Sequence, residues 1–158
     1  MLATVQRICQ ARKDQTGTAL QAWLENLTAQ EVVQLGMIAD VMDESLLLIR
    51  QVDSEQCDSA EIGNYVQSFA DRIQMLILQR AILTTTGYTK LVMDLLLEGK
   101  LKFFACGAAR QLGPCQDESI DQCFKNMEVW VRMALEVLRT EFPHYGIFSA
   151  FGAALRLT

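Results

Sequence analysis

Apolar residues recur at intervals of three and four along most of this 158-residue chain, which is the period of one face of an α-helix. The clearest series occupies residues 29–52 and consists of Val32, Leu35, Ala39, Met42, Leu46 and Ile49. The same stretch carries a second apolar set, Met37, Val41 and Leu48. A helix that is apolar on two faces is expected to lie centrally and to be contacted on more than one side.

Local signals set the limits of this helix and of two further long helices. Thr28 and Glu31 have the spacing of a capping box, in which each side chain bonds to the other residue's backbone amide. A second long pattern covers 62–83 and should end at the run 84–87, where β-branched residues and glycine disfavour a helix. A third long helix is predicted to begin at Asp117 and to end at Pro143. Its core stripe is predicted to be Ile120, Phe124, Met127, Val131, Ala134 and Leu138.

Shorter helices are expected between and before the long ones. Thr18 and Gln21 repeat the capping-box spacing, with Gly17 as the break before it. Residues 88–98 are predicted to form a short helix that ends at Gly99. Residues 100–112 are predicted to form a further short helix. We therefore predict an all-α fold for residues 1–158: a single helical bundle domain of three long helices, each of about 24–26 residues, and four or five short ones.

Charge argues against several classes of partner. The chain has 14 basic and 19 acidic residues, a net charge of −5, which disfavours nucleic acid and anionic membranes. Two stretches, 1–13 and 99–113, are basic and contain no acid, each with a charge of +3. Basic islands on an acidic body favour an acidic protein partner or a second copy of the chain over a nucleic-acid groove. The other interpretation is that these basic residues lie on helix faces exposed to solvent.

Metals, cofactors and membrane spans find no support in the sequence. The five cysteines form no Cys-x-x-Cys pair and His144 is the only histidine, so neither a metal site nor a cofactor is predicted. No apolar run approaches the roughly 18 residues of a transmembrane helix. No secretory signal is recognised, and reduced thiols predict a cytoplasmic protein, although the acid-free opening also has the composition of a short mitochondrial presequence.

Arg139 and His144 are separated by four residues. This spacing resembles the Arg-x4–6-His motif of the HEPN family, small all-α bundles that often dimerise. In the ribonucleases of that family the Arg and the His act at the scissile phosphate. The resemblance implies an alternative function as a HEPN-like ribonuclease or an inactive relative, with Arg139 and His144 at the site. Thr140 and Pro143 depart from the family's usual pattern.

Cys115 is a candidate nucleophile of a different kind. It follows Gly113 and Pro114 and precedes the start of a helix, where the helix dipole can lower the pKa of a thiol. His144 would have to serve as its base. The other interpretation of Cys115 is a structural or mildly redox-sensitive thiol.

Aromatic residues mark the C-terminal segment. Phe142, Tyr145, Phe148 and Phe151 recur every three residues, and after Pro143 the only charge is Arg156. Segment 144–158 is therefore either a last core helix or an association helix that packs on a second subunit. Trp23 and Trp130 are further candidate anchors. The function predicted is a non-enzymatic interaction module, a homodimer or the binder of another protein, with a bundle that binds an apolar small molecule as another alternative.

Overall fold

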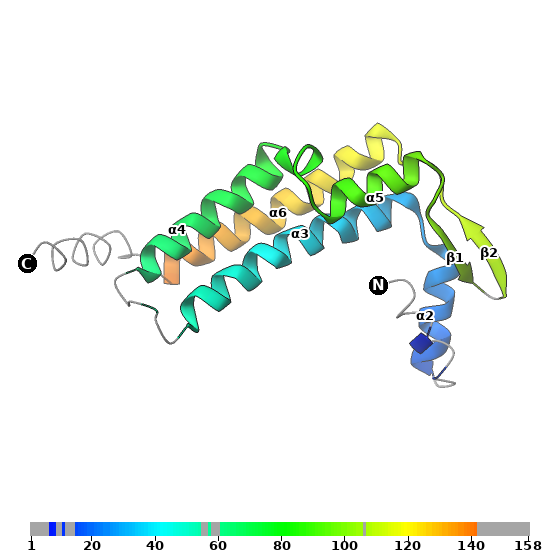
Figure 1. Cartoon of the computed structure of the whole chain (residues 1–158), viewed down its shortest axis with the longest axis horizontal. Coiled ribbons are helices and arrows are strands. Elements are labelled where there is room, and N and C mark those ends of the chain that lie inside the picture. The colour runs from blue at the N-terminus through cyan, green and yellow to red at the C-terminus, as the bar shows by residue number, and fades with distance from the viewer. Residues whose placement is uncertain are drawn as a thin grey trace, which may run out of the picture.

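A computed structural model describes residues 7, 8, 11, 15–54, 57, 61–105 and 107–141. The chain is mostly helical, as predicted, and contains one small two-stranded sheet among these residues (Figure 1). The elements in order are α2 (Gln15–Asn26), α3 (Ala29–Val52), α4 (Ile62–Ile73), the π-helical turn η1 (Gln74–Leu78), the 3-10 turn η2 (Ala81–Leu83), α5 (Tyr88–Leu97), β1 (Lys102–Ala105), β2 (Ala108–Gln111) and α6 (Asp117–Glu141).

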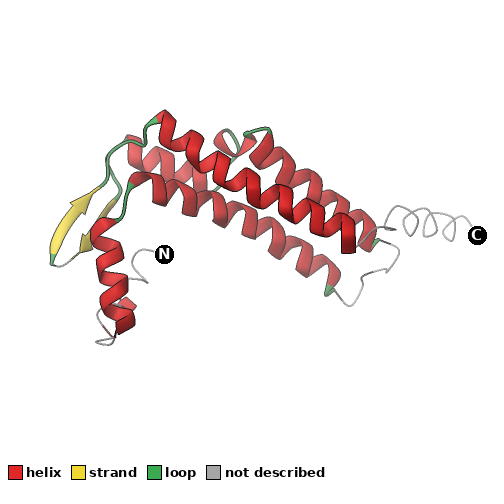
Figure 2. Ribbon diagram, turned by 180° about the vertical axis from the view of Figure 1, so that it is seen from behind, coloured by secondary structure: helices red, strands yellow, loops and turns green. Residues whose placement is uncertain are grey.

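Helix α3 is the centre of the arrangement. It packs against α4, α5 and α6, and α4 also contacts α6. Figures 1 and 2 show α3, α4 and α6 side by side, with α5 over one half of α3 and the hairpin and α2 together at one end. The core is formed by residues of all these elements, among them Val33, Met37, Ile73, Phe124 and Val131.

The capping box predicted at the start of α3 is present. The Thr28 hydroxyl accepts the Glu31 amide at 3.2 Å, and the Glu31 carboxylate accepts the Thr28 amide at 2.7 Å. The buried face is the second predicted set and not the first. Val33, Met37 and Val41 are buried, whereas most of the longer series is exposed or half-buried. Both faces are apolar, so periodicity alone could not decide which one the other helices cover.

The second long helix is shorter than predicted. Helix α4 has 12 residues, η1 continues it to Leu78, and the chain leaves at Arg80, whose φ of 56° is left-handed. The Arg80 guanidinium explains this early exit. It pairs with Asp121 at 2.7 Å and lies 4.6 Å from the centre of the Phe124 ring, so two residues of α6 hold the turn.

Residues 102–111 form an antiparallel hairpin, so the predicted helix over 100–112 is wrong. Phe103 and Ala105 are buried while Lys102 and Phe104 are exposed, an alternation of period two. The turn contains Gly107, whose φ of 77° favours glycine. With strands of only four residues each, the alternation is too short to be distinguished from a helical pattern in the sequence.

The hairpin holds the end of α2. Arg110 donates to the backbone carbonyls of Leu24 (3.0 Å) and Glu25, both in the last turn of α2, where carbonyls lie beyond the regular hydrogen-bond pattern of the helix. The same guanidinium lies 5.6 Å from the centre of the Phe103 ring. Gly17 lies inside α2 and is buried there, so it is not the break that the sequence suggested.

Helix α5 ends as predicted but begins on a cap from another helix. Gly99 is left-handed at φ 63°, and the Lys100 amide bonds to Leu95 O at 2.8 Å, as in a Schellman motif. At the other end, Asp40 of α3 accepts the amides of Tyr88 (2.6 Å) and Thr89 (2.9 Å). A Cβ at Gly87 would lie 2.5 Å from the Asp40 carboxylate, so glycine permits this approach.

We expect Asp40→Ala to lower the free energy of unfolding by about 1 kcal/mol, because the first amides of α5 lose their acceptor. Asp43→Ala is the matched control on the same helix, where no such bond is lost, and it should change stability by less than about 0.5 kcal/mol. Urea denaturation followed by circular dichroism measures both. Equal effects of the two substitutions would contradict the role given to Asp40.

Gly36 sets the distance between α3 and α5. A Cβ there would lie 3.0 Å from Thr89 Cα, a backbone atom. Gly36→Ala gains about 1 kcal/mol of helix propensity, but the overpacking costs about 1–3 kcal/mol, so we expect net destabilisation. Gly113→Ala, where a Cβ meets nothing within 4 Å, should be close to neutral. Thermal unfolding of both variants tests this, and a stabilised Gly36→Ala would show that the two helices separate easily.

Candidate interaction surface

Helices α3 and α6 lie side by side and run in the same direction. The Cys123 thiol donates to Gln30 O at 3.4 Å, and one turn further along both helices the Asn126 amide donates to Gln34 Oε1, also at 3.4 Å. Figure 1 shows both helices starting near the hairpin and ending at the opposite end of the molecule. Because both helices advance together, residues that follow these pairs at helical spacing remain neighbours.

The side of α3 next to this contact is apolar and open to solvent. Its large side chains are between 42% and 52% exposed: Ile38, Met42, Leu46 and Ile49. Leu35 lies on the same side and is half-buried. Helical periodicity places this stripe next to Gln34 on the circumference of α3, on the side of Gln34 that is farther from the core. All of these residues except Ile38 belong to the first apolar series of the sequence, on a helix that was expected to be contacted on more than one side.

Helix α6 carries a matching stripe on the side next to α3. Val129, Trp130, Met133 and Val137 are 37% to 71% exposed and follow Asn126 at spacings of three and four. The core stripe of this helix was predicted from the sequence, whereas this second stripe was not. Its signal was a parallel set of apolar residues shifted by two or three positions from the core stripe.

We call these two stripes together the α3–α6 apolar face: Leu35, Ile38, Met42, Leu46, Ile49, Val129, Trp130, Met133 and Val137. The polar residues within it by helical spacing include Gln34, Ser45 and Asn126. Two charged residues border it: Glu31 lies one turn before Leu35, and Glu136 lies one turn after Met133. Other charged residues of the two helices lie on other sides. Glu44, for example, points to α4, where it pairs with Arg72 at 2.9 Å.

Trp130 is the predicted anchor that the structure places on this face, while Trp23 is half-buried and packs against the core. The remaining predicted anchors, Phe142, Tyr145, Phe148 and Phe151, lie outside the described residues. His144 does so too, and the pairing of Arg139 with His144 therefore stays a prediction. Arg139 itself is exposed in the last turn of α6, 3.8 Å from Glu136.

Cys115 is half-buried, and burial raises the pKa of its thiol; the nearby Asp117 carboxylate raises it further. Both effects oppose the lowering that its place before a helix suggested, so the position does not activate this thiol. Cys123 is fully buried, and burial followed by the influence of Cys115 raises its pKa to about 11. No trio of His, Cys, Asp and Glu side chains in the described part of the chain is placed to hold a metal ion.

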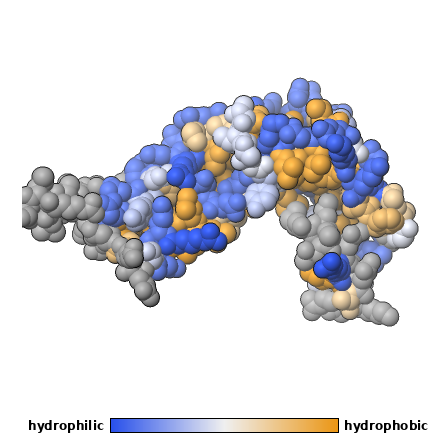
Figure 3. All heavy atoms as spheres, in the orientation of Figure 1, coloured by the Kyte–Doolittle hydropathy of each residue, from blue (hydrophilic) through white to orange (hydrophobic). Residues whose placement is uncertain are grey.

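A groove lies on another side of α3, between η1 and the start of α5. Its volume is about 680 Å³. Apolar and acidic side chains share its lining: Asp40, Asp43, Glu44, Arg72, Met75, Leu76, Thr85, Thr86, Gly87, Tyr88 and Leu91. Figure 3, which shows this side of the molecule, has apolar atoms among hydrophilic ones over α3 and α5.

Comparison with known proteins gives no indication of function, so the α3–α6 apolar face is the main guide to it. No protein-family model, curated protein or solved structure matches the chain. Of the helices in the described ranges, none has the length and apolar character needed to cross a membrane.

At pH 8 we expect Cys123 to react with iodoacetamide at least about 100-fold more slowly in the folded protein than in urea. In the folded protein the raised pKa of the thiol lowers the fraction of reactive thiolate, and the sulfur atom is also buried. Mass spectrometry of the peptide that contains Cys123 gives the two rates. The unfolded chain serves as the control for intrinsic reactivity. Comparable rates in both states would show that α6 opens from α3 readily.

Proposed function

We propose that this chain is a non-enzymatic helical bundle module that self-associates as a homodimer through the α3–α6 apolar face. The observation that carries the proposal is that this face has nine apolar residues, most of them exposed, with charged residues only at its border, Glu31 and Glu136. Contiguous exposed apolar surface of this kind typically marks an association site. The other sides of the same helices carry the charges expected of surface that faces water.

The lack of charge favours a second copy as the occupant. Two identical chains most often meet about a two-fold axis, where each residue lies near its own counterpart. A charged residue near the axis would meet a like charge, which is destabilising. A face whose charges lie only at its border avoids that repulsion near the axis, whereas recognition of a different, charged partner would call for complementary charges within the face.

The nine residues of the face make up only part of a dimer interface. They extend over about 21 Å of α3, from Leu35 to Ile49, and about 12 Å of α6, from Val129 to Val137, and two adjacent helices make the face about 20 Å wide. The product, at most roughly 420 Å² per copy, is about half of the ~800 Å² per partner of a stable interface, so the proposed dimer needs further contact surface. Trp130 supplies an aromatic anchor, and the flexible side chains of Met42 and Met133 can adapt to an opposing surface.

The C-terminal segment extends the same proposal. Phe142, Tyr145, Phe148 and Phe151 follow directly after the last described residue of α6, where the apolar face ends. We propose that these aromatic residues enlarge the dimer contact. The free thiols of Cys57, Cys115 and Cys123 suit the reducing cytoplasm in which we place the protein.

Met42→Glu and Met133→Glu test the dimer on its two helices. Each would bury two unpaired carboxylates per dimer, which at about 2 kcal/mol each weakens association by roughly 1,000-fold. Sedimentation velocity at 1–100 μM, a range of ~100-fold, reports the shift from dimer to monomer. Circular dichroism checks that the monomer remains folded.

Leu97→Glu is the matched control. Leu97 is 74% exposed at the end of α5, away from the face, so the same change in charge and polarity there should leave the dimer intact. The proposal fails if the wild-type chain is monomeric across this concentration range, or if Leu97→Glu dissociates the dimer as strongly as Met42→Glu.

A further inference from the structure

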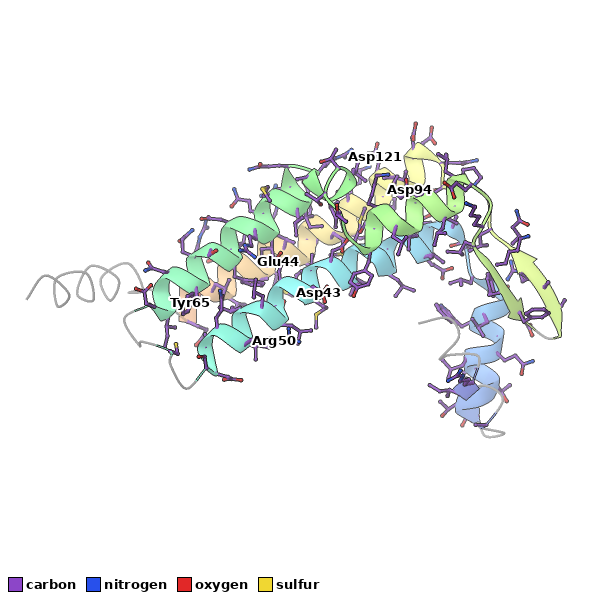
Figure 4. The ribbon with its side chains drawn as sticks, viewed as in Figure 1. Asp43, Glu44, Arg50, Tyr65, Asp94 and Asp121 are labelled. Atoms are coloured by element: carbon purple, nitrogen blue, oxygen red, sulfur yellow. The ribbon has the colours of Figure 1, made fainter. Side chains whose placement is uncertain are left out.

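Helix α5 covers only the first half of α3 on its side of the bundle. Its first turn is held at Asp40, halfway along the 24 residues of α3. The second half of α3 extends about 18 Å beyond this point, and Figure 4 shows Asp43 and Glu44 on it. The groove begins there, between α3 and the side of α4 and η1 that carries Arg72 and Met75. It therefore lies where a helix in line with α5 would continue.

One line of residues on α3 connects the α5 contact with the groove. Gly36 meets the backbone of α5, and Asp40 caps that helix. Asp43 lines the groove, and Leu47, which is partly exposed, follows one turn later. These four residues are spaced by three and four, so they share one side of α3. The surface that receives α5 thus continues beneath the groove, and this favours a second helix as the occupant.

The groove is acidic. Its lining contains three carboxylates, Asp40, Asp43 and Glu44, and one guanidinium, Arg72, which gives a net charge of −2. Asp40 accepts the two α5 amides, and Glu44 is paired with Arg72 at 2.9 Å. Asp43 has no hydrogen bond or ion pair within the described residues. It is the carboxylate that a cation of the occupant would meet.

Apolar side chains around Asp43 remain open to solvent. Met75 of η1 and both Tyr88 and Leu91 of α5 line the groove and are exposed. An occupant that buries them must offer aliphatic side chains together with a cation. An amphipathic helix presents such a set on one face, at spacings of three and four.

We propose that the groove between α3, η1 and α5 binds a short basic amphipathic helix of another protein, with aliphatic side chains on Met75 and Leu91 and a basic residue on Asp43. Charge complementarity selects this occupant, because a cation offsets the net charge of the groove. A helix of about 12 residues matches the length of the uncovered half of α3. The groove and the α3–α6 apolar face lie on different sides of α3, so this docking does not depend on self-association.

A synthetic helical peptide of about 12 residues serves as the probe. It carries leucines at spacings of three and four on one face, arginines in its last turn, and alanine or glutamine elsewhere. Fluorescence anisotropy of the labelled peptide measures its binding to the full-length chain. We expect a dissociation constant below about 100 μM, and binding at least about fivefold weaker when the arginines are replaced by glutamates. Absence of binding by the arginine peptide would overturn the proposal.

Two pairs of variants locate the binding site. Asp43→Lys and Leu91→Gln should each weaken binding of the arginine peptide at least about fivefold. Glu128→Lys on α6 and Leu97→Gln at the end of α5 make the same changes at positions that do not line the groove, and both should leave binding unchanged. Circular dichroism checks that all four variants are folded. Equal weakening by a variant and its control would contradict docking in the groove.

A photo-crosslink identifies what lies in the groove. A benzophenone-bearing phenylalanine replaces Tyr88, and capture of the arginine peptide supports the proposal. Capture of residues 1–13 or 142–158 of the chain itself, with the peptide present, would overturn it, because the groove would then be filled from within the protein. Met42→Glu should bind the peptide as tightly as the wild type does. Peptide binding and dimer formation can therefore fail separately.

Discussion

The structure depends on the packing of α3, a 24-residue helix with apolar residues on two faces. One face, with Val33, Met37 and Val41, is fully covered because α4, α5 and α6 all pack against it. A chain of this size has no further helix in its described part to cover the other face. Because α3 has apolar residues on two faces and the described part of the chain covers only one, the other face stays exposed. Exposed apolar surface in water is unfavourable, so burial of this face would stabilise the protein.

Polar contacts between elements fix where the helices around α3 begin and end. Asp40 supplies the cap that Gly87 lacks, Arg80 anchors the exit from η1 on α6, and Arg110 closes the end of α2. Each contact joins residues more than forty positions apart in the chain. Helix termini carry amides or carbonyls without partners, so a distant side chain that satisfies them also sets the relative position of two elements. The groove beside α5 exists because Asp40 holds the first turn of α5 partway along α3.

The sequence predicts local features well and the choice between similar surfaces poorly. The capping box of α3, the stripe of α6 and the Gly99 terminus each depend on residues within one or two turns, and each is found as predicted. The hairpin over 102–111 was missed because two four-residue strands give too few alternations to compete with a helical pattern. Both apolar faces of α3 were expected to be contacted, and the sequence could not show which one the other helices leave open, because the two faces have the same periodicity. For the candidate site, Trp130 was predicted, whereas Val129 and Val137 were visible in the pattern but not recognised as a second stripe.

An acidic chain with an apolar face must keep its charges away from that face if it is to self-associate. The whole sequence carries −5, so two copies repel each other at long range. At physiological salt this repulsion extends only about 8 Å from each charge. Met42 has Ile38, Ser45 and Leu46 as its neighbours one turn away along α3, whereas Met133 has Glu136 one turn further along α6. In the proposed dimer the repulsion would therefore arise mainly at the α6 edge of the face, where water and salt screen it most effectively.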